Sequence, residues 1–273
     1  MIILVLIVLG LCFGSFTNAL VWRLHKQDSL KGKQAKAKYS ISQGRSMCVH
    51  CGHILRAQDL IPVVSWALLR GKCRYCSRPI QDTPTPELIT PLLFVTSYYF
   101  WPIAFDTQGI VVFIVWLILL VGFVALALYD IRWHLLPNRI IFPLMGLVSL
   151  QIVIQTLFFD FGLAGLIATF FSILAGGGIF WVLFQASDGK WIGGGDVKLG
   201  FLIGAILGSP LQSLLFIFTA SLIGTIFAVP MLLSGKTKKS AHLAFGPFLL
   251  ISAVIVHLFG AILITWYRSQ IGL

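Results

Sequence analysis

The chain has 273 residues, of which 58% are hydrophobic and only 11% are charged. Soluble globular domains carry about 25% charged residues, so this composition excludes a soluble domain. The formal net charge is +11. In a chain built largely of apolar segments, we expect this charge to record how the protein crosses a membrane rather than nucleic-acid binding.

Seven segments approach or exceed the ~20 apolar residues that a helix needs to cross a bilayer. An eighth is short, because about 12 residues rise only ~18 Å along a helix. Considered alone, this short segment would be a re-entrant or buried helix. Counted as a crossing, it predicts an all-α membrane protein with about eight transmembrane helices, of which the sixth is short. In chain order the segments are 2–22, 87–104, 109–129, 137–158, 161–186, the short 197–208, 210–234 and 243–267.

The basic residues favour counting the short segment as a crossing. In that case four loops share one face of the membrane: 23–86, 130–136, 187–196 and 235–242. These loops and their immediate flanks hold every Lys and Arg except Arg268. Cytoplasmic loops carry the basic excess, so we predict that this face is cytoplasmic and that both chain ends lie outside. The charge of the first loop could also draw it onto anionic lipid head groups.

Three parts are expected along the chain. Residues 1–22 form a first transmembrane helix, residues 23–86 a cytoplasmic domain and residues 87–273 a membrane domain of seven helices. Basic residues follow the first apolar segment rather than precede it, which indicates a retained anchor rather than a cleaved signal peptide.

Four of the five cysteines lie in the loop 23–86, as two Cys-x-x-Cys pairs separated by 21 residues: Cys48, Cys51, Cys73 and Cys76. Two such pairs at nearly this separation are typical of a tetrahedral zinc site. Disulfides or redox pairs, and unligated thiols, are the alternatives, and a reducing compartment disfavours disulfides. A small domain of this kind needs a metal to hold it together, so the loop could also be a zinc-stabilised scaffold without chemistry of its own.

Two acids, Asp130 and Asp196, stand at the ends of apolar segments. Ionisable groups at membrane depth are costly, which makes each a hypothesis for a functional site. Asp196 follows Gly193-Gly194-Gly195, a string that lets another backbone or a ligand approach closely. The structural alternatives are that Asp196 caps a helix beginning at residue 197 and that Asp130 pairs with a neighbouring basic side chain.

If the two acids meet, repulsion keeps both from ionising together and they titrate as a coupled pair. One carboxylate can then activate water while the other, protonated, donates to the carbonyl oxygen of a scissile bond. No serine, cysteine or zinc protease motif stands out as a rival. The sequence alone does not show that the helices carrying the two acids pack together.

An ordered series of motifs resembles one family, the bacterial prepilin leader peptidases, which are membrane aspartyl proteases with a GxGD motif. The motifs are Gly14-Ser15-Phe16-x-Asn18, Cys48-x-x-Cys51, Ser65-Trp66, Cys73-x-x-Cys76, Glu87-Leu88, Asp130, Leu135-Leu136-Pro137-Asn138, Gly193-x-Gly195-Asp196-x-Lys198 and Phe245-Gly246-Pro247-Phe248.

The resemblance implies an enzyme with two activities in the bacterial inner membrane. Its members cut the basic leader from type IV prepilins and type II secretion pseudopilins after a glycine, at the cytoplasmic face. They then methylate the new N-terminus with S-adenosylmethionine. The family's catalytic aspartates correspond to Asp130 and Asp196, with Gly193, Gly195 and Lys198 as supporting motif residues. The tetracysteine loop accompanies methylation, and Asp59 and Glu87 are the acidic candidates near it for binding the methyl donor.

Two other interpretations are kept. The methylase part could be inactive in an otherwise active peptidase. Alternatively, the chain could be a proton-linked transporter or membrane scaffold whose zinc loop docks a partner. Departures from the family pattern at Pro84, Pro86, residues 187–191 and residues 242–244 leave the substrate preference open.

Overall fold

The computed structural model describes residues 1–30, 39–41, 44–80, 82–159, 161–233, 244–270 and 272, without the side chains of residues 231 and 232. The lysines of the segment 31–38, Asp160, His242 and the lysines of the loop 235–242 lie outside the described residues. The described residues are helical, and their only bridges of β type are two isolated ones in the tetracysteine loop. The predicted all-α class is therefore confirmed.

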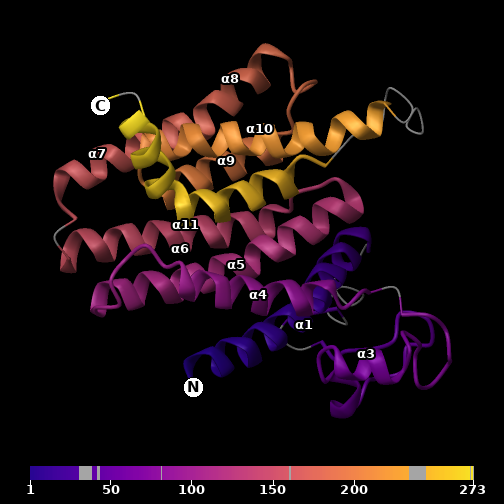
Figure 1. Ribbon diagram of the computed structural model, residues 1–273. Helices are drawn as coiled ribbons and strands as arrows, with labels where there is room; N and C mark the ends of the chain where they lie inside the picture. The colour runs from indigo at the N-terminus through magenta and orange to yellow at the C-terminus, as the bar shows by residue number, and fades with distance from the viewer. Residues whose placement is uncertain are drawn as a thin grey trace. The chain divides into compact units, whose positions relative to one another are not determined.

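Two compact units make up the chain, Met1–Tyr99 and Phe100–Leu273 (Figure 1). The first contains α1 (Ile2–Ser29), the short helices η1 (Ala57–Leu60) and α3 (Val64–Leu68), and α4 (Thr85–Tyr99). In this unit α1 packs along α4. The buried guanidinium of Arg23 donates to the carbonyl oxygens of Ser40 and Ile41, which ties the start of the loop to α1.

The second unit is a bundle of helices. In chain order these are α5 (Thr107–Trp133), α6 (Asn138–Phe158), α7 (Gly162–Ile173), a π-helical turn (Leu174–Gly178), α8 (Ile179–Ala186), α9 (Gly194–Leu207), α10 (Pro210–Leu233) and α11 (Gly246–Gln270). The short helix α9 contacts α6, α7, α8, α10 and α11. It is thus the central helix of the bundle.

Six helical stretches in the described residues are long and apolar enough to cross a membrane: Ile2–Ser29, Thr107–Trp133, Asn138–Phe158, Gly162–Ala186, Pro210–Pro230 and Gly246–Gln270. The other two predicted crossings correspond to α4, with 15 residues, and α9, with 14. Helix α4 ends at Tyr99, five residues before the predicted end, just ahead of Trp101-Pro102, because a residue before proline disfavours helical backbone. The total of eight crossings stays a prediction.

Close backbone contact through glycines holds α9 in place. A Cβ atom on Gly204 would lie 2.6 Å from the carbonyl oxygen of Ser172, and one on Gly200 would lie 2.7 Å from that of Gly176 in the π-helical turn. The Ser172 hydroxyl also donates to the Gly204 carbonyl oxygen at 2.7 Å. Small residues at such interfaces let membrane helices approach closely and gain dispersion contacts and hydrogen bonds. The spacing of Gly200 and Gly204 therefore directs one face of α9 against α7 and α8.

The C-terminal end of α9 reaches a cavity of about 320 Å³ that is also lined by Gln151, Gln155 and Gln212. Two further lining atoms, Thr169 Oγ1 and His257 Nε2, are buried and have no hydrogen-bond partner among the described residues. Buried polar groups are nearly always hydrogen-bonded, so we expect ordered water here. A polar cavity of this kind allows a short helix to end at membrane depth.

The glycine contact of α9 predicts a specific loss of stability. Gly204→Ala should lower the free energy of unfolding by about 1–3 kcal/mol, because the added methyl group meets backbone atoms that cannot move aside. Thermal unfolding of the purified protein in detergent measures this loss. Gly146→Ala in α6 is the matched control, because its methyl group would meet nothing within 4 Å. Equal stability of the two variants would contradict the packing role.

Candidate functional site

Asp130 lies near the C-terminal end of α5 and is only 5% exposed. Its Oδ2 atom accepts a hydrogen bond from the backbone N–H of Gly246, the first residue of α11, at 3.1 Å. A Cβ atom at position 246 would lie 2.6 Å from the same oxygen. Glycine at this position therefore brings the α11 backbone onto the carboxylate.

Asp196 lies in the first turn of α9, which begins at Gly194 with Gly193 as its N-cap residue. Asp196 is therefore inside the helix, and the alternative that it caps a helix beginning at residue 197 is wrong. The Asp196 and Asp130 side chains are close enough for their charges to interact. Helices α6 and α11 each contact both α9 and α5. The structure thus brings the two predicted acids together through these two helices.

Gly195 and Lys198 of the GxGD segment contact the residues at and just before the start of α6. A Cβ atom on Gly195 would lie 2.9 Å from Leu136 Cβ, and one on Gly193 would lie 3.4 Å from Asp196 Oδ2. The ammonium group of Lys198 donates to Asn138 Oδ1 at 2.9 Å. Together these contacts hold the first turn of α9 beside the end of α5.

Sequence reasoning gave no role to three residues of this site: Leu136, Asn138 and Gly246. All three belong to motifs that carry the family resemblance, and that was the available signal. Their contacts with Gly195, Lys198 and Asp130 span 59, 60 and 116 positions in the sequence. Contacts at such separations depend on how the helices pack.

The four cysteines of the loop form one cluster, and their sulfur atoms all lie within 4.8 Å of one another. The Sγ atoms of Cys48 and Cys76 are 3.9 Å apart, and every cysteine is a free thiol. Tetrahedral zinc with Zn–S bonds of ~2.3 Å separates its sulfur ligands by about 3.8 Å. The cluster therefore fits a zinc ion, as predicted, and it is not a pair of disulfides.

Each Cys-x-x-Cys pair forms the same turn. The N–H of Gly52 donates to the Cys48 carbonyl oxygen, and the N–H of Ser77 donates to that of Cys73, each at 2.9 Å. The residue after each pair has a positive φ, +69° at Gly52 and +55° at Ser77. This backbone conformation favours glycine, so Ser77 adopts it at a cost.

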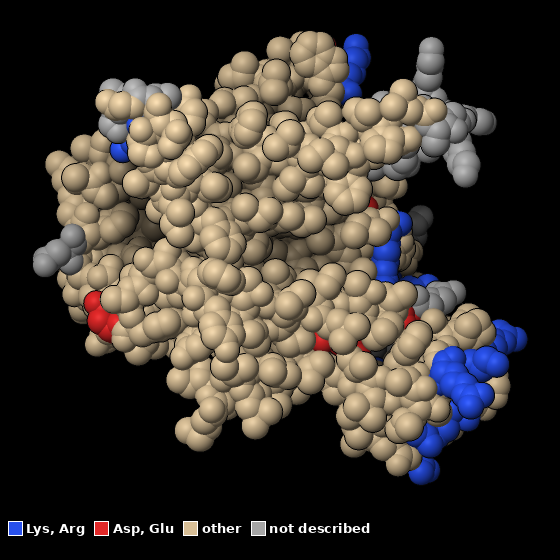
Figure 2. All heavy atoms as spheres, viewed as in Figure 1, with Lys and Arg blue, Asp and Glu red and all other residues tan. Residues whose placement is uncertain are grey.

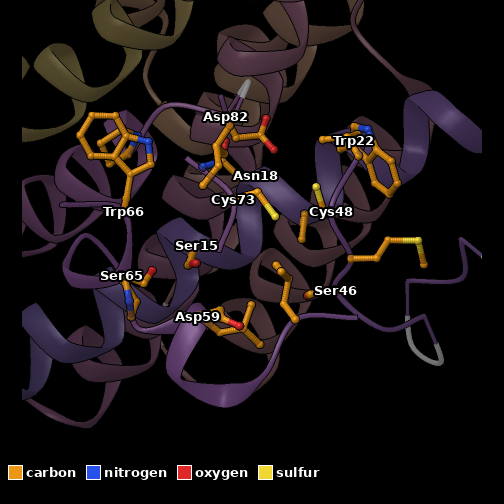
Figure 3. Close-up of a pocket in the computed structure, with 18 of the residues that line it drawn as sticks. Ser15, Asn18, Trp22, Ser46, Cys48, Asp59, Ser65, Trp66, Cys73 and Asp82 are labelled. Atoms are coloured by element: carbon orange, nitrogen blue, oxygen red, sulfur yellow. The ribbon is translucent and has the colours of Figure 1, made fainter. Parts of the chain in front are cut away.

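A cavity of about 440 Å³ lies within the first unit, between α1, the tetracysteine loop and the start of α4. Figure 3 shows Ser15, Asn18 and Trp22 of α1 around this cavity together with Asp59, Ser65 and Trp66 of the loop. Asp59 and Glu87, the two acidic candidates from the sequence, both line it. The volume is in the range of cavities that hold small-molecule ligands.

The carboxylate of Asp59 is already occupied by partners in its own loop. It accepts hydrogen bonds from the Arg74 side chain at 2.7 Å, the Tyr75 hydroxyl at 2.9 Å and the Arg56 N–H at 3.1 Å. Burial raises the pKa of Asp59, but these hydrogen bonds outweigh it and hold the pKa below its ordinary value. Asp59 therefore stabilises the loop around the cysteines, and its role in binding a methyl donor stays a prediction.

Basic side chains gather on the surface of this loop, where Figure 2 shows them over the region around α3. The exposed ones are Arg45, Arg56, Arg70, Lys72, Arg74 and Arg78. Between residues 44 and 80 the only acid is Asp59. This face carries the charge that would attract anionic lipid head groups.

The helical membrane bundle, the two aspartates whose charges interact and the tetracysteine loop agree with the comparisons with known proteins. Residues 8–101 match the model of the bacterial peptidase A24 N-terminal domain, and residues 112–229 match that of the type IV leader peptidase family.

Two curated relatives bear the name prepilin leader peptidase/N-methyltransferase. The one from Bacillus subtilis (strain 168) is 30% identical over 96% of both chains. The one from Pseudomonas aeruginosa is 31% identical over 94% of this chain and 90% of its own. No solved structure matches this chain significantly. The chain belongs to the type IV leader peptidase family, and it is a multi-pass membrane protein.

The backbone of the cysteine turns generates a testable prediction. Ser77→Gly should stabilise the loop and Gly52→Ser should destabilise it, each by about 1 kcal/mol, because only the preference for positive φ changes. The zinc-loaded protein is challenged with a chelator, and zinc release is followed with a colorimetric indicator. We expect slower release from Ser77→Gly and faster release from Gly52→Ser. The opposite order would contradict the described turn geometry.

Proposed function

We propose that this protein cleaves the basic leader from type IV prepilins and pseudopilins and then methylates the new N-terminus. The observation that carries the proposal is the pair of adjacent acids, Asp130 and Asp196, in a family whose members are named for both activities. The substrates would be membrane proteins with a leader, a class that the family name implies.

The catalytic chemistry is that of a coupled acid pair. One carboxylate activates water while its protonated partner donates to the carbonyl oxygen of the scissile bond. The Gly246 N–H orients the Asp130 carboxylate. Lys198 and Asn138 fix the first turn of α9, and with it Asp196. These contacts hold the two carboxylates in position before substrate binds.

Cleavage would occur at the cytoplasmic face of the bacterial inner membrane, with both chain ends outside. The distribution of basic residues supports this orientation. A substrate with a basic leader and an apolar helix would place its scissile bond at the same face. A glycine before that bond would let the helix unwind locally, as an acid-pair protease requires.

Methyl transfer would belong to the tetracysteine part, residues 23–86, together with neighbouring residues of α1 and α4, while residues 87–273 carry the peptidase. Zinc bound to Cys48, Cys51, Cys73 and Cys76 would hold the loop folded. S-adenosylmethionine supplies the methyl group. The cavity between α1 and the loop has room for this donor, and Trp22 and Trp66 line it. An aromatic wall suits the donor's sulfonium cation.

The peptidase role predicts the effect of neutralising either acid. Asp130→Asn and Asp196→Asn should each lower the rate of prepilin cleavage by about 10²–10⁴-fold or more, because neither amide can exchange protons with water or substrate. Mass spectrometry of a prepilin incubated with the purified enzyme reports the cut site and any added methyl group together.

The control for these variants is Asp188→Asn, an exposed position near the same segment. This variant should cleave at the wild-type rate, and all three should keep the wild-type melting temperature within a few degrees. Full cleavage by Asp196→Asn would refute the acid-pair mechanism. The transporter interpretation makes a different prediction. The wild-type protein would cleave no prepilin but would carry out proton-linked transport, and Asp196→Asn would abolish that transport.

Zinc removal separates the two activities. Cys48→Ser or treatment with a strong chelator should abolish methyl transfer, because the loop loses its metal cross-link, while cleavage should fall by less. Incubating cleaved pilin with labelled methyl donor measures the first activity, and the prepilin assay measures the second. An enzyme that cleaves but never transfers the label, even with zinc bound, would show that the methylase part is inactive.

A further inference from the structure

Glu87 is an acid of the first unit whose side chain makes little contact with polar groups among the described residues. It lies in the first turn of α4, and its side chain lines the 440 Å³ cavity. Its Oε2 atom accepts a hydrogen bond from the backbone N–H of Val63 at 2.6 Å. Within the described residues the other carboxylate oxygen, Oε1, accepts no hydrogen bond.

The backbone that meets Glu87 is strained. Val63 has φ +61° and ψ −48°, and the N–H of Val64 donates to the Pro62 carbonyl oxygen at 2.6 Å. These values describe a classic γ-turn, which is rare and especially unfavourable for a β-branched residue. Such conformations are energetically unfavourable and concentrate at functional sites. The strain turns the Val63 N–H towards the Glu87 carboxylate.

The main chain of Glu87 is held by α1. A Cβ atom on Gly14 would lie 2.4 Å from the Pro86 carbonyl oxygen and 2.7 Å from Glu87 Cα. The Asn18 amide also donates to the Thr83 carbonyl oxygen at 3.1 Å. The carboxylate is therefore fixed from two sides, by α1 against its backbone and by the γ-turn against one oxygen.

Two other acids, Asp59 and Asp82, line the cavity. Asp59 is occupied by three hydrogen bonds within its loop, and Asp82 also has a partner. Glu87, with a single hydrogen bond from the Val63 N–H, therefore has room for a further hydrogen-bond donor. A cationic nitrogen is the group that such a carboxylate binds most strongly.

We propose that Glu87 binds the α-ammonium group of the cleaved substrate and accepts one of its protons, so that methyl transfer begins from a neutral amine. This role rests on the proposed methyl transfer. An α-amino group is largely protonated at neutral pH, and only its neutral form has the lone pair that attacks carbon. The methyl donor needs no such acceptor, because its sulfonium carries no proton that must leave.

The step balances as follows. The ammonium gives one proton to the Glu87 carboxylate, and the nitrogen lone pair forms an N–C bond to the methyl carbon as the S–C bond breaks. The electron pair of that bond stays on sulfur, which leaves as a neutral thioether. The product is a methylated ammonium, and Glu87 then returns its proton to water.

Glu87→Gln tests the role, because the amide oxygen can still accept from the Val63 N–H while the side chain can no longer take a proton. We expect methyl transfer to a synthetic pre-cleaved pilin peptide to fall about 5–10-fold at pH 7, because only about a tenth of α-amino groups are neutral in solution at that pH. Zinc content and calorimetric binding of S-adenosylmethionine should stay at wild-type levels. Prepilin cleavage should persist, since the acid pair is untouched.

The pH profile distinguishes proton transfer from a structural role. In Glu87→Gln, methyl transfer should recover towards the wild-type rate as the pH rises above about 8, where solvent deprotonates the substrate amine. Glu87→Asp keeps a carboxylate and should retain more activity at pH 7 than Glu87→Gln. A merely structural loss would be independent of pH and equal in both variants.

Several outcomes would overturn the proposal. Near wild-type methyl transfer by Glu87→Gln at pH 7 shows that no proton acceptor is needed there. Loss of donor binding shows that Glu87 holds S-adenosylmethionine instead, and loss of zinc or a flat pH profile shows a structural role. A wild-type enzyme that cleaves and binds the donor without forming any N-methyl product would refute the methyl transfer itself, and this role with it.

Discussion

The close contact of α9 with the π-helical turn is the constraint on which the arrangement of Asp130 and Asp196 depends. Because Gly200 and Gly204 have no side chains, α9 lies directly against the backbone of residues 172–176, in the middle of the bundle. Its first turn then lies beside the end of α5, within reach of Asp130. A larger residue at either glycine would push α9 away from this backbone and shift Asp196 relative to Asp130.

The two units are held together by different interactions. In the second, apolar helices surround a pair of acids, and the backbone N–H of Gly246 and the side chains of Lys198 and Asn138 hold that pair in position. In the first, a small loop has too little apolar core to fold alone, so four cysteines gather where one zinc ion fits. The loop also lines a cavity against α1.

Much of this arrangement could be predicted from the sequence because it depends on local composition. The apolar segments became helices, and even the short 197–208 is the body of α9. The spacing of the cysteines predicted their cluster. Helix ends were less well predicted, since α4 stops at Tyr99 and α9 begins ahead of Asp196, where glycines rather than the aspartate start the helix.

The sequence by itself determined that this is a helical membrane protein with a basic face, a four-cysteine loop and two isolated acids. Length, hydropathy and residue spacing are enough for that, because each acts over a few helical turns. Only the tertiary structure decided that α6 and α11 bring the acids together, that Gly246 meets Asp130, and that a strained turn at Val63 points at Glu87. These contacts join residues up to 116 positions apart, and they depend on small residues that allow helices to pack closely.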